Sequence, residues 1–171
     1  MDANVAALRE LSGRAARDGP SNALYVRAPV EDLPCELAGV ADRVTVVLPW
    51  GSLLAAVARP FLPCLRSIRG LCQPQARLTV VLGIDPVRDQ AEAHRLGLPA
   101  LDAAHLEGPL RAGYAEAGFA LRSVSPLAPA PLAEWPSTWA RKLAHGHARS
   151  VFRIDAWAIQ PIFADSGVGQ E

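Results

Sequence analysis

The chain has 171 residues, half of them hydrophobic, which suits one globular domain and excludes an intrinsically disordered protein. Lys plus Arg and Asp plus Glu number 17 each, so the formal net charge of zero argues against nucleic-acid binding over the whole surface and leaves room for local patches. The three cysteines form no CxxC pair, and no secretory segment or apolar run of membrane-spanning length is seen, so we expect reduced thiols, no metal, no membrane association and a cytoplasmic location.

Hydrophobic patterning predicts helices and strands that alternate along the first half of the chain. In order, we expect a helix over 3–17, a strand over 23–28, a loop over 29–34, a strand over 44–48, and a helix from residue 52 that breaks near Pro60 and Pro63 and resumes to about residue 71.

The second half continues the alternation after a buried strand. We expect a strand over 78–82, helices over 87–95 and 103–117, a strand over 119–124, a Pro/Ala-rich connection over 126–131, a helix beginning near Ser137, a strand over 150–157, and a frayed tail over 166–171. The pattern predicts an α/β fold that is similar to the Rossmann-like sheet of class I methyltransferases, mostly parallel with an antiparallel C-terminal edge.

Two tryptophans lie in polar, well-defined settings. Trp50 directly follows the strand predicted over 44–48, and Trp139 opens a stretch that continues with Arg141 and Lys142. An aromatic plane at the end of a strand and another beside cationic side chains suit the stacking of an unstacked nucleobase. Because tryptophan is largely buried on average, both side chains are also compatible with a core or lid position.

Cationic side chains gather near the second tryptophan. Only Glu134 and Asp155 offset this group locally, which favours an RNA-binding patch over the alternative of a solvated face. The group consists of Arg141, Lys142, His145, His147, Arg149 and Arg153.

Four segments resemble the aminoglycoside-resistance 16S ribosomal RNA adenine-N1 methyltransferases. They are EDLPCEL at 31–37, LPWGSLL at 48–54, GLP at 97–99 and STWARKLAHG at 137–146. The resemblance runs from about residue 2 to residue 157, and the two tryptophan segments at this separation are its specific part. GLP alone would carry no weight.

The resemblance implies a site for the target base. Trp50 and Trp139 would sandwich a flipped adenine, and Ser137 would lie close to the second ring. Leu48 stands where an aromatic side chain is more usual in the family.

The resemblance also implies contacts to ribosomal RNA. His147 stands where an arginine is commoner, and the basic helix near the N-terminus is shorter and less lysine-rich than in the family. The implied RNA-binding residues are Arg14, Arg17, Arg141, Lys142, His147 and Arg149.

The cofactor implied by the resemblance is S-adenosylmethionine. Asp2 would match the carboxylate that binds the ribose hydroxyls, Val30 and Glu31 would match the adenine-side loop, and Val47 and Ser52 would line the methionine end.

The Gly-rich loop of the family is not found in the sequence. In the family this loop and the first two strands precede the position of Asp2, so we expect residues 1–160 to form a class I methyltransferase domain that is N-terminally truncated and lacks those strands, followed by a flexible tail over 161–171. Three explanations stay open: an internal start at Met1, a genuine fragment, or a partner that supplies the missing strands. A strand over 23–28 would then lack a neighbour on one side.

The function implied by the resemblance is methylation of N1 of an adenine in the 16S rRNA decoding site, giving aminoglycoside resistance. The expected partner is the 30S ribosomal subunit, and we expect a monomer. Two alternatives remain: a truncated, non-catalytic remnant or RNA-binding module, and a class I methyltransferase acting on transfer RNA.

Overall fold

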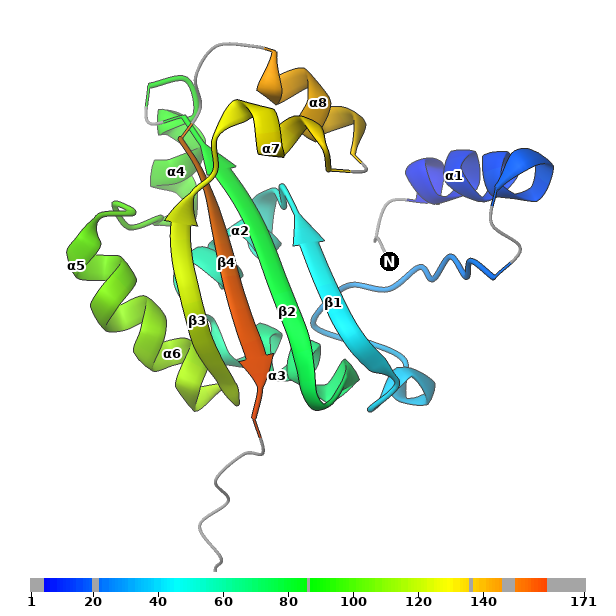
Figure 1. Cartoon of the computed structure of the whole chain (residues 1–171), viewed down its shortest axis with the longest axis horizontal. Coiled ribbons are helices and arrows are strands. Elements are labelled where there is room, and N and C mark those ends of the chain that lie inside the picture. Colours follow the sequence, from blue (N-terminus) through cyan, green and yellow to red (C-terminus); the bar gives the residue numbers. More distant parts are fainter. Residues whose placement is uncertain (1–4, 20–21, 86, 136, 146–149, 160–171) are drawn as a thin grey trace, which may run out of the picture.

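Four strands form one mixed sheet in a computed structural model that describes residues 5–19, 22–85, 87–135, 137–145 and 150–159. The strand order is β1-β2-β4-β3 (Figure 1), and β1 pairs with β2 in parallel. β4 lies antiparallel to both β2 and β3, so the predicted antiparallel strand at the C-terminal end of the domain is confirmed. The prediction of a mostly parallel sheet is wrong, because two of the three pairings between the described strands are antiparallel and β4 lies inside the sheet. The strands are β1 (Ala41–Val47), β2 (Cys72–Ile84), β3 (Phe119–Pro126) and β4 (Ser150–Ala158).

Helices cover one face of this sheet and one of its ends. In Figure 1, α2 and α3 lie behind the sheet, α6 runs along β3, α7 and α8 sit at the end where β1 and β2 terminate, and α1 stands apart from the sheet beside β1. The helices are α1 (Val5–Asp18), α2 (Gly51–Ala58), α3 (Leu62–Leu71), α4 (Gln90–Leu96), α5 (Ala103–His105), α6 (Arg111–Glu116), α7 (Pro129–Ala133) and α8 (Thr138–Ala144), with a 3-10 turn at Cys35–Leu37 and a π-helical turn at Leu106–Leu110. None of the helices in the described part of the chain has the length and apolar character needed to cross a bilayer.

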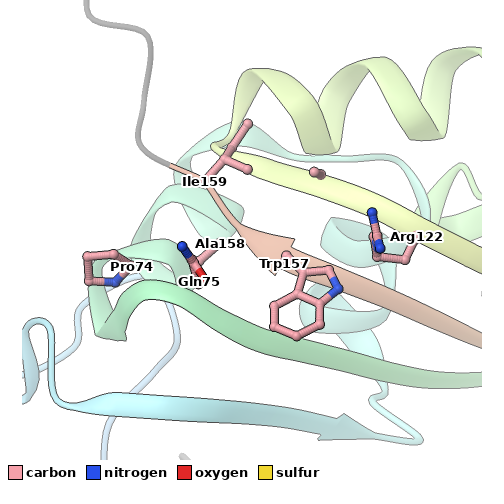
Figure 2. A pocket seen from close by; sticks show the side chains of 7 residues that line it. Pro74, Gln75, Arg122, Trp157, Ala158 and Ile159 are labelled. Carbon is pink, nitrogen blue, oxygen red and sulfur yellow. The ribbon is translucent and has the colours of Figure 1, made fainter.

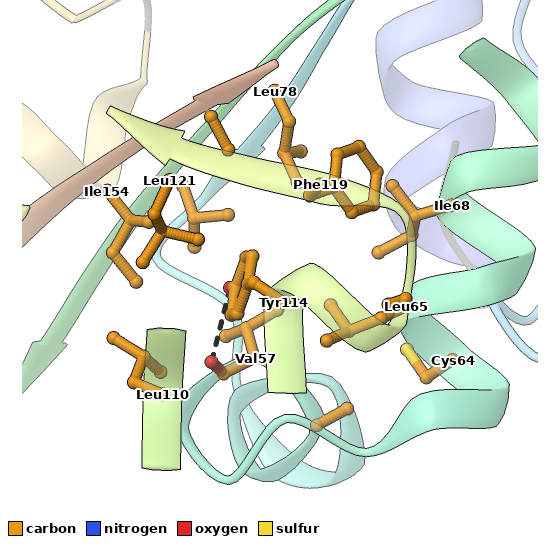
Figure 3. Packing of buried hydrophobic residues seen from close by; sticks show 14 of the residues in the cluster. Val57, Cys64, Leu65, Ile68, Leu78, Leu110, Tyr114, Phe119, Leu121 and Ile154 are labelled. Atoms are coloured by element: carbon orange, nitrogen blue, oxygen red, sulfur yellow. Dashed lines mark hydrogen bonds between the residues drawn. The ribbon is translucent and has the colours of Figure 1, made fainter. Parts of the chain in front are cut away.

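The main hydrophobic core lies between the sheet and α2, α3 and α6. Alternate residues of β2, such as Leu78 and Val80, are fully buried on this face, as expected for a strand with helices on one side. Figure 3 shows Tyr114 of α6 at the centre of the core, where its hydroxyl donates a hydrogen bond to the Val57 carbonyl oxygen at 3.2 Å. Its ring centroid lies 6.4 Å from that of Phe119. The tyrosine therefore fills the core with its polar atom satisfied.

A second, smaller cluster lies under α7 and α8. Its buried members are Val81 of β2, Leu132 of α7, Ala140 of α8 and Val151 of β4. The side chain of Leu48 packs against it from the end of β1. Through this cluster, α7 and α8 pack against the carboxyl end of β2.

Several sequence predictions of secondary structure were wrong. Residues 23–28 form no strand: only Arg27 takes part in an isolated bridge, because no described strand lies alongside to complete a ladder. The connection over 126–131 instead opens helix α7 at Pro129, where proline suits the first turn. The helix predicted over 103–117 is present, but it contains a π-helical turn around Pro109, whose ring nitrogen cannot donate a hydrogen bond.

Candidate base-binding and cofactor site

The loop after β1 projects Trp50 from the end of the sheet. Leu48 adopts a left-handed backbone with φ of 47°, and its N–H donates to the Val81 carbonyl oxygen at 2.7 Å. Gly51, with φ of 60°, then starts α2, a conformation that glycine adopts without a steric cost. Between these two turns Trp50 is extended and 52 % exposed, so its indole is available to a ligand.

Trp139 lies in the first turn of α8, at the same end of the sheet (Figure 1). It is 50 % exposed, whereas the next residue, Ala140, is fully buried in the smaller cluster. The helix therefore holds one side chain inward and leaves the indole outward. Both tryptophans are exposed enough for a stacking role. Neither lies in the core, which was the alternative left open because tryptophan is usually buried.

A cavity of about 580 Å³ adjoins Trp50 and brings together four of the predicted cofactor residues. Val30 and Glu31 line it from the loop before β1, Val47 from the end of β1, and Ser52 from the start of α2. Ile68 and Leu71 of α3 also line the cavity. Such a volume is typical of small-molecule sites.

The side chains that line the cavity are mostly apolar. Among the described residues that line it, Glu31 is the only ionisable one, and Ser52 and Thr45 offer hydroxyls. Apolar side chains suit a purine ring, and a carboxylate accepts hydrogen bonds from amino or hydroxyl groups. The residues present therefore fit a nucleoside-like cofactor. Ile68 and Leu71, one helical turn apart, were not singled out from the sequence, where their spacing indicates only a buried helix face.

Comparison with known proteins decides the family. A family model of 16S rRNA (adenine(1408)-N(1))-methyltransferases of the NpmA type matches residues 1–158. The chain belongs to this family. A 16S rRNA (adenine(1408)-N(1))-methyltransferase of Escherichia coli is 31% identical over 147 residues, which cover 85% of this chain and 67% of the relative. The enzyme of the same name from Streptoalloteichus hindustanus is 32% identical over 151 residues, covering 84% and 67%.

Solved structures agree with this membership. The aminoglycoside resistance methyltransferase NpmB1 superposes with a TM-score of 0.78 at 43% identity, covering 92% of this chain and 73% of that one. A mutant form of the 16S rRNA (adenine(1408)-N(1))-methyltransferase from Catenulisporales acidiphilia gives a TM-score of 0.80 at 30% identity, covering 94% and 75%. The resemblance seen in the sequence and the methyltransferase-like α/β sheet are thus both confirmed.

The predicted RNA-binding residues that the structure describes lie on two separate helices. Arg141 and Lys142 are exposed on α8 next to Trp139. Arg14 and Arg17 are exposed on α1, where Arg14 forms an ion pair with Glu10 at 2.6 Å. The structure therefore brings two of these cations to the tryptophan end of the sheet. Three further predicted site residues, Asp2, His147 and Arg149, lie outside the described residues.

Ser137 acts as the N-cap of α8. Its Oγ accepts a hydrogen bond from the Ala140 N–H at 3.3 Å, which satisfies one of the free donors at the start of the helix. The sequence prediction placed Ser137 among the catalytic residues, and a role in holding the helix of Trp139 has direct geometric support.

Replacing Ser137 by alanine is expected to destabilise α8 by about 0.5–2 kcal/mol, because a seven-residue helix depends strongly on its cap. Amide hydrogen exchange should become faster over α8 and stay unchanged in β2. Ser137→Asp, which keeps an acceptor at this position, should restore protection. Equal exchange in the alanine and aspartate variants would contradict a capping role.

Two cysteines, Cys64 and Cys72, are buried as free thiols. Burial, and to a smaller extent the Glu31 carboxylate, raises the pKa of the Cys64 thiol to about 11. Burial also raises the pKa of Cys72, partly offset by the Arg69 guanidinium. Since the thiolate is the nucleophile, neither cysteine is reactive at neutral pH. Within the described ranges no three His, Cys, Asp or Glu side chains are arranged to hold a metal ion.

A second cavity, of about 670 Å³, lies at the opposite end of the sheet (Figure 2). Trp157 and Arg122 line it together with Pro74 and Gln75. The Arg77 guanidinium carbon lies 4.7 Å from the centroid of the Trp157 ring, so this indole already has a cationic partner. The cavity contains none of the predicted site residues. It does not adjoin Trp50, and the chemistry of the first cavity fits a cofactor better.

Proposed function

We propose that the protein methylates N1 of adenine 1408 in the 16S rRNA of the 30S subunit, with S-adenosylmethionine as methyl donor and with the flipped base stacked between Trp50 and Trp139. One observation carries this proposal: Trp50 both lines the cavity that fits the cofactor and exposes 52 % of its surface. A base stacked on that indole would lie next to the donor. The names of the relatives supply the target nucleotide.

The lining of the cavity matches the chemical needs of this reaction. When bound, S-adenosylmethionine would supply an electrophilic methyl group. N1 of adenine carries an in-plane lone pair, so the transfer needs alignment of the reactants and no strong general base. This agrees with the cavity lining: among the described residues that line it, only Glu31 is ionisable. Val30, Glu31, Val47 and Ser52 would hold the cofactor, and the two indoles would hold the base.

The tryptophans would also stabilise the product. Methylation at N1 places a positive charge on the adenine ring, and the faces of Trp50 and Trp139 attract cations. Stacking contributes about 1–3 kcal/mol for each base–aromatic contact, which helps to offset the cost of taking the base out of its helix. Arg141 and Lys142, exposed beside Trp139, would contact RNA phosphates. Arg14 and Arg17 of α1 would form a second phosphate contact.

A pair of measurements tests the proposal. Calorimetric titration with S-adenosylmethionine should show binding, and methylation assays should modify purified 30S subunits at adenine 1408 and leave transfer RNA unmodified. Absence of cofactor binding would instead identify a non-catalytic remnant or RNA-binding module. Modification of transfer RNA with unmodified 30S subunits would identify a class I methyltransferase with another substrate.

The cofactor residues can be tested separately from the base site. Glu31→Gln removes the charge and keeps the shape. It should weaken S-adenosylmethionine binding about tenfold, the lower end of the effect expected from a hydrogen bond to a charged group worth about 1.5–3 kcal/mol, because Glu31 is exposed. Glu36→Gln is the matched control, because Glu36 is exposed five residues further on and does not line the cavity. Equal affinities of the two variants in calorimetry would remove Glu31 from the proposed site.

A further inference from the structure

Leu48 holds a backbone conformation that leucine rarely adopts. Its φ of 47° lies in the left-handed region, where a side chain other than glycine costs of order 1 kcal/mol or more. Such strain persists only where the surroundings fix the residue. Here the Leu48 N–H is held by the Val81 carbonyl oxygen at 2.7 Å, and Pro49, which follows, is buried.

The side chain of Leu48 fits against the bare backbone of Gly83. A Cβ atom built at Gly83 would lie 3.2 Å from Leu48 Cδ2 and 3.3 Å from Val151 Cγ2, which is closer than ordinary van der Waals contact. Gly83 lies inside β2, where it pairs with Val151 of β4, a position at which glycine weakens a strand. The missing side chain therefore leaves the space that Leu48 occupies.

The same contact is linked to both exposed indoles. Leu48 precedes Trp50 by two residues, with the rigid ring of Pro49 between them. Its side chain packs against the smaller cluster, which also contains Ala140, the residue after Trp139. The smaller hydrophobic cluster thus holds chain segments next to both tryptophans in place.

We infer that Leu48, seated against Gly83, is the positioning residue that sets Trp50 relative to Trp139. This inference rests on the proposed function, because it concerns the spacing of the base-stacking pair. A side chain at residue 83 would push Leu48 away and displace Trp50 from the adenine. Since misplacement by about 1 Å can cost about 100-fold in rate, a shift of a few tenths of an ångström should cost several-fold.

The test compares Gly83→Ala with Gly70→Ala. Gly70 lies in α3, and a Cβ atom there would meet nothing within 4 Å, so it is the matched control. Gly83→Ala should lower kcat for 30S methylation about threefold to tenfold, and Gly83→Val should lower it further, with a smaller change in the KM for S-adenosylmethionine because Leu48 is one of many residues that line the cofactor cavity. If a variant only folded less completely, fewer molecules would be active but each would keep its rate. Titration with S-adenosylmethionine therefore counts the binding-competent molecules, and kcat is calculated per competent molecule.

A double variant separates positioning from general damage. Leu48→Ala removes the atom that a residue-83 methyl would strike, so the effects of Gly83→Ala and Leu48→Ala should not multiply. The double variant should be at least as active as Leu48→Ala alone. In a protein that keeps Trp50 as its only tryptophan, Gly83→Val should also change the indole emission, and Gly70→Ala should leave it unchanged.

The outcomes distinguish this inference from the proposed function. Full activity of Gly83→Val, multiplicative effects in the double variant, or an unchanged Trp50 emission would overturn the positioning role, even if alanine at Trp50 abolishes methylation. Absence of methylation by the parent protein would overturn the proposed function instead. The emission comparison would then still decide whether residue 83 sets the position of Trp50.

Discussion

Replacing Trp50 or Trp139 by alanine is expected to lower the rate of 30S methylation about tenfold to 100-fold, and Trp139→Ala should leave S-adenosylmethionine affinity within about twofold, because Trp139 does not line the cofactor cavity. Each indole would contribute about 1–3 kcal/mol of stacking to a base that must leave its helix, and each 1.4 kcal/mol corresponds to a factor of ten. Both side chains are half exposed, so their removal should cost the fold little. Single-turnover methylation together with calorimetry of cofactor binding measures the two effects.

Phe61 supplies the control for both tryptophan variants. It is 50 % exposed and lies just before α3, and it does not line the cavity beside Trp50. Phe61→Ala should therefore methylate at the parent rate. Phenylalanine at either tryptophan position should retain part of the activity, because it keeps a smaller aromatic face. Parent-like methylation by both alanine variants would refute the base sandwich.

The largest stability effect is expected from Phe119→Ala. Phe119 begins β3, is fully buried in the main core and faces the ring of Tyr114. Truncating a buried phenylalanine removes apolar contacts and leaves a cavity, at a cost of about 3–5 kcal/mol. That is a large share of the roughly 5–15 kcal/mol by which a domain is stable. Urea unfolding followed by circular dichroism should show a lower midpoint.

The exposed Phe61 is again the comparison, because surface truncation usually changes stability by less than about 0.5 kcal/mol. If Phe119→Ala and Phe61→Ala unfold at the same urea concentration, the core between sheet and helices is not packed as described. Tyr114→Phe tests the neighbouring hydrogen bond to the Val57 carbonyl oxygen, and the net loss should be about 1 kcal/mol.

The position of several candidate residues at the carboxyl end of β1 could be predicted from the sequence, whereas the strand order could not. Trp50, Val47 and Ser52 could be placed because they flank a strongly apolar strand, and the carboxyl end of such a strand is where α/β sheets bind ligands. The order β1-β2-β4-β3 depends on contacts between segments far apart in the chain, which local periodicity does not report.

Individual errors have local physical causes. Residues 23–28 carry an apolar pattern but have no ladder to join. The early part of β2 was missed because Pro74 and the left-handed Gln75, with φ of 63°, interrupt its pairing with β1 in a stretch that reads as polar. Ser137 was assigned by resemblance, and its capping hydrogen bond could have been predicted from its place before a helix. The conformation of Leu48 and its contact with Gly83 left no sequence signal.

The two hydrophobic clusters differ greatly in size, and this difference determines which part of the molecule unfolds locally most easily. The main core has nineteen buried members among the described residues, whereas the cluster under α7 and α8 has four. α7 and α8 also pack chiefly against each other. Local opening free energy follows the number of buried contacts, so these helices can detach while the sheet stays folded. Trp139 thus lies on a weakly packed part of the proposed base site, and binding of the proposed RNA substrate would reposition it at low energetic cost.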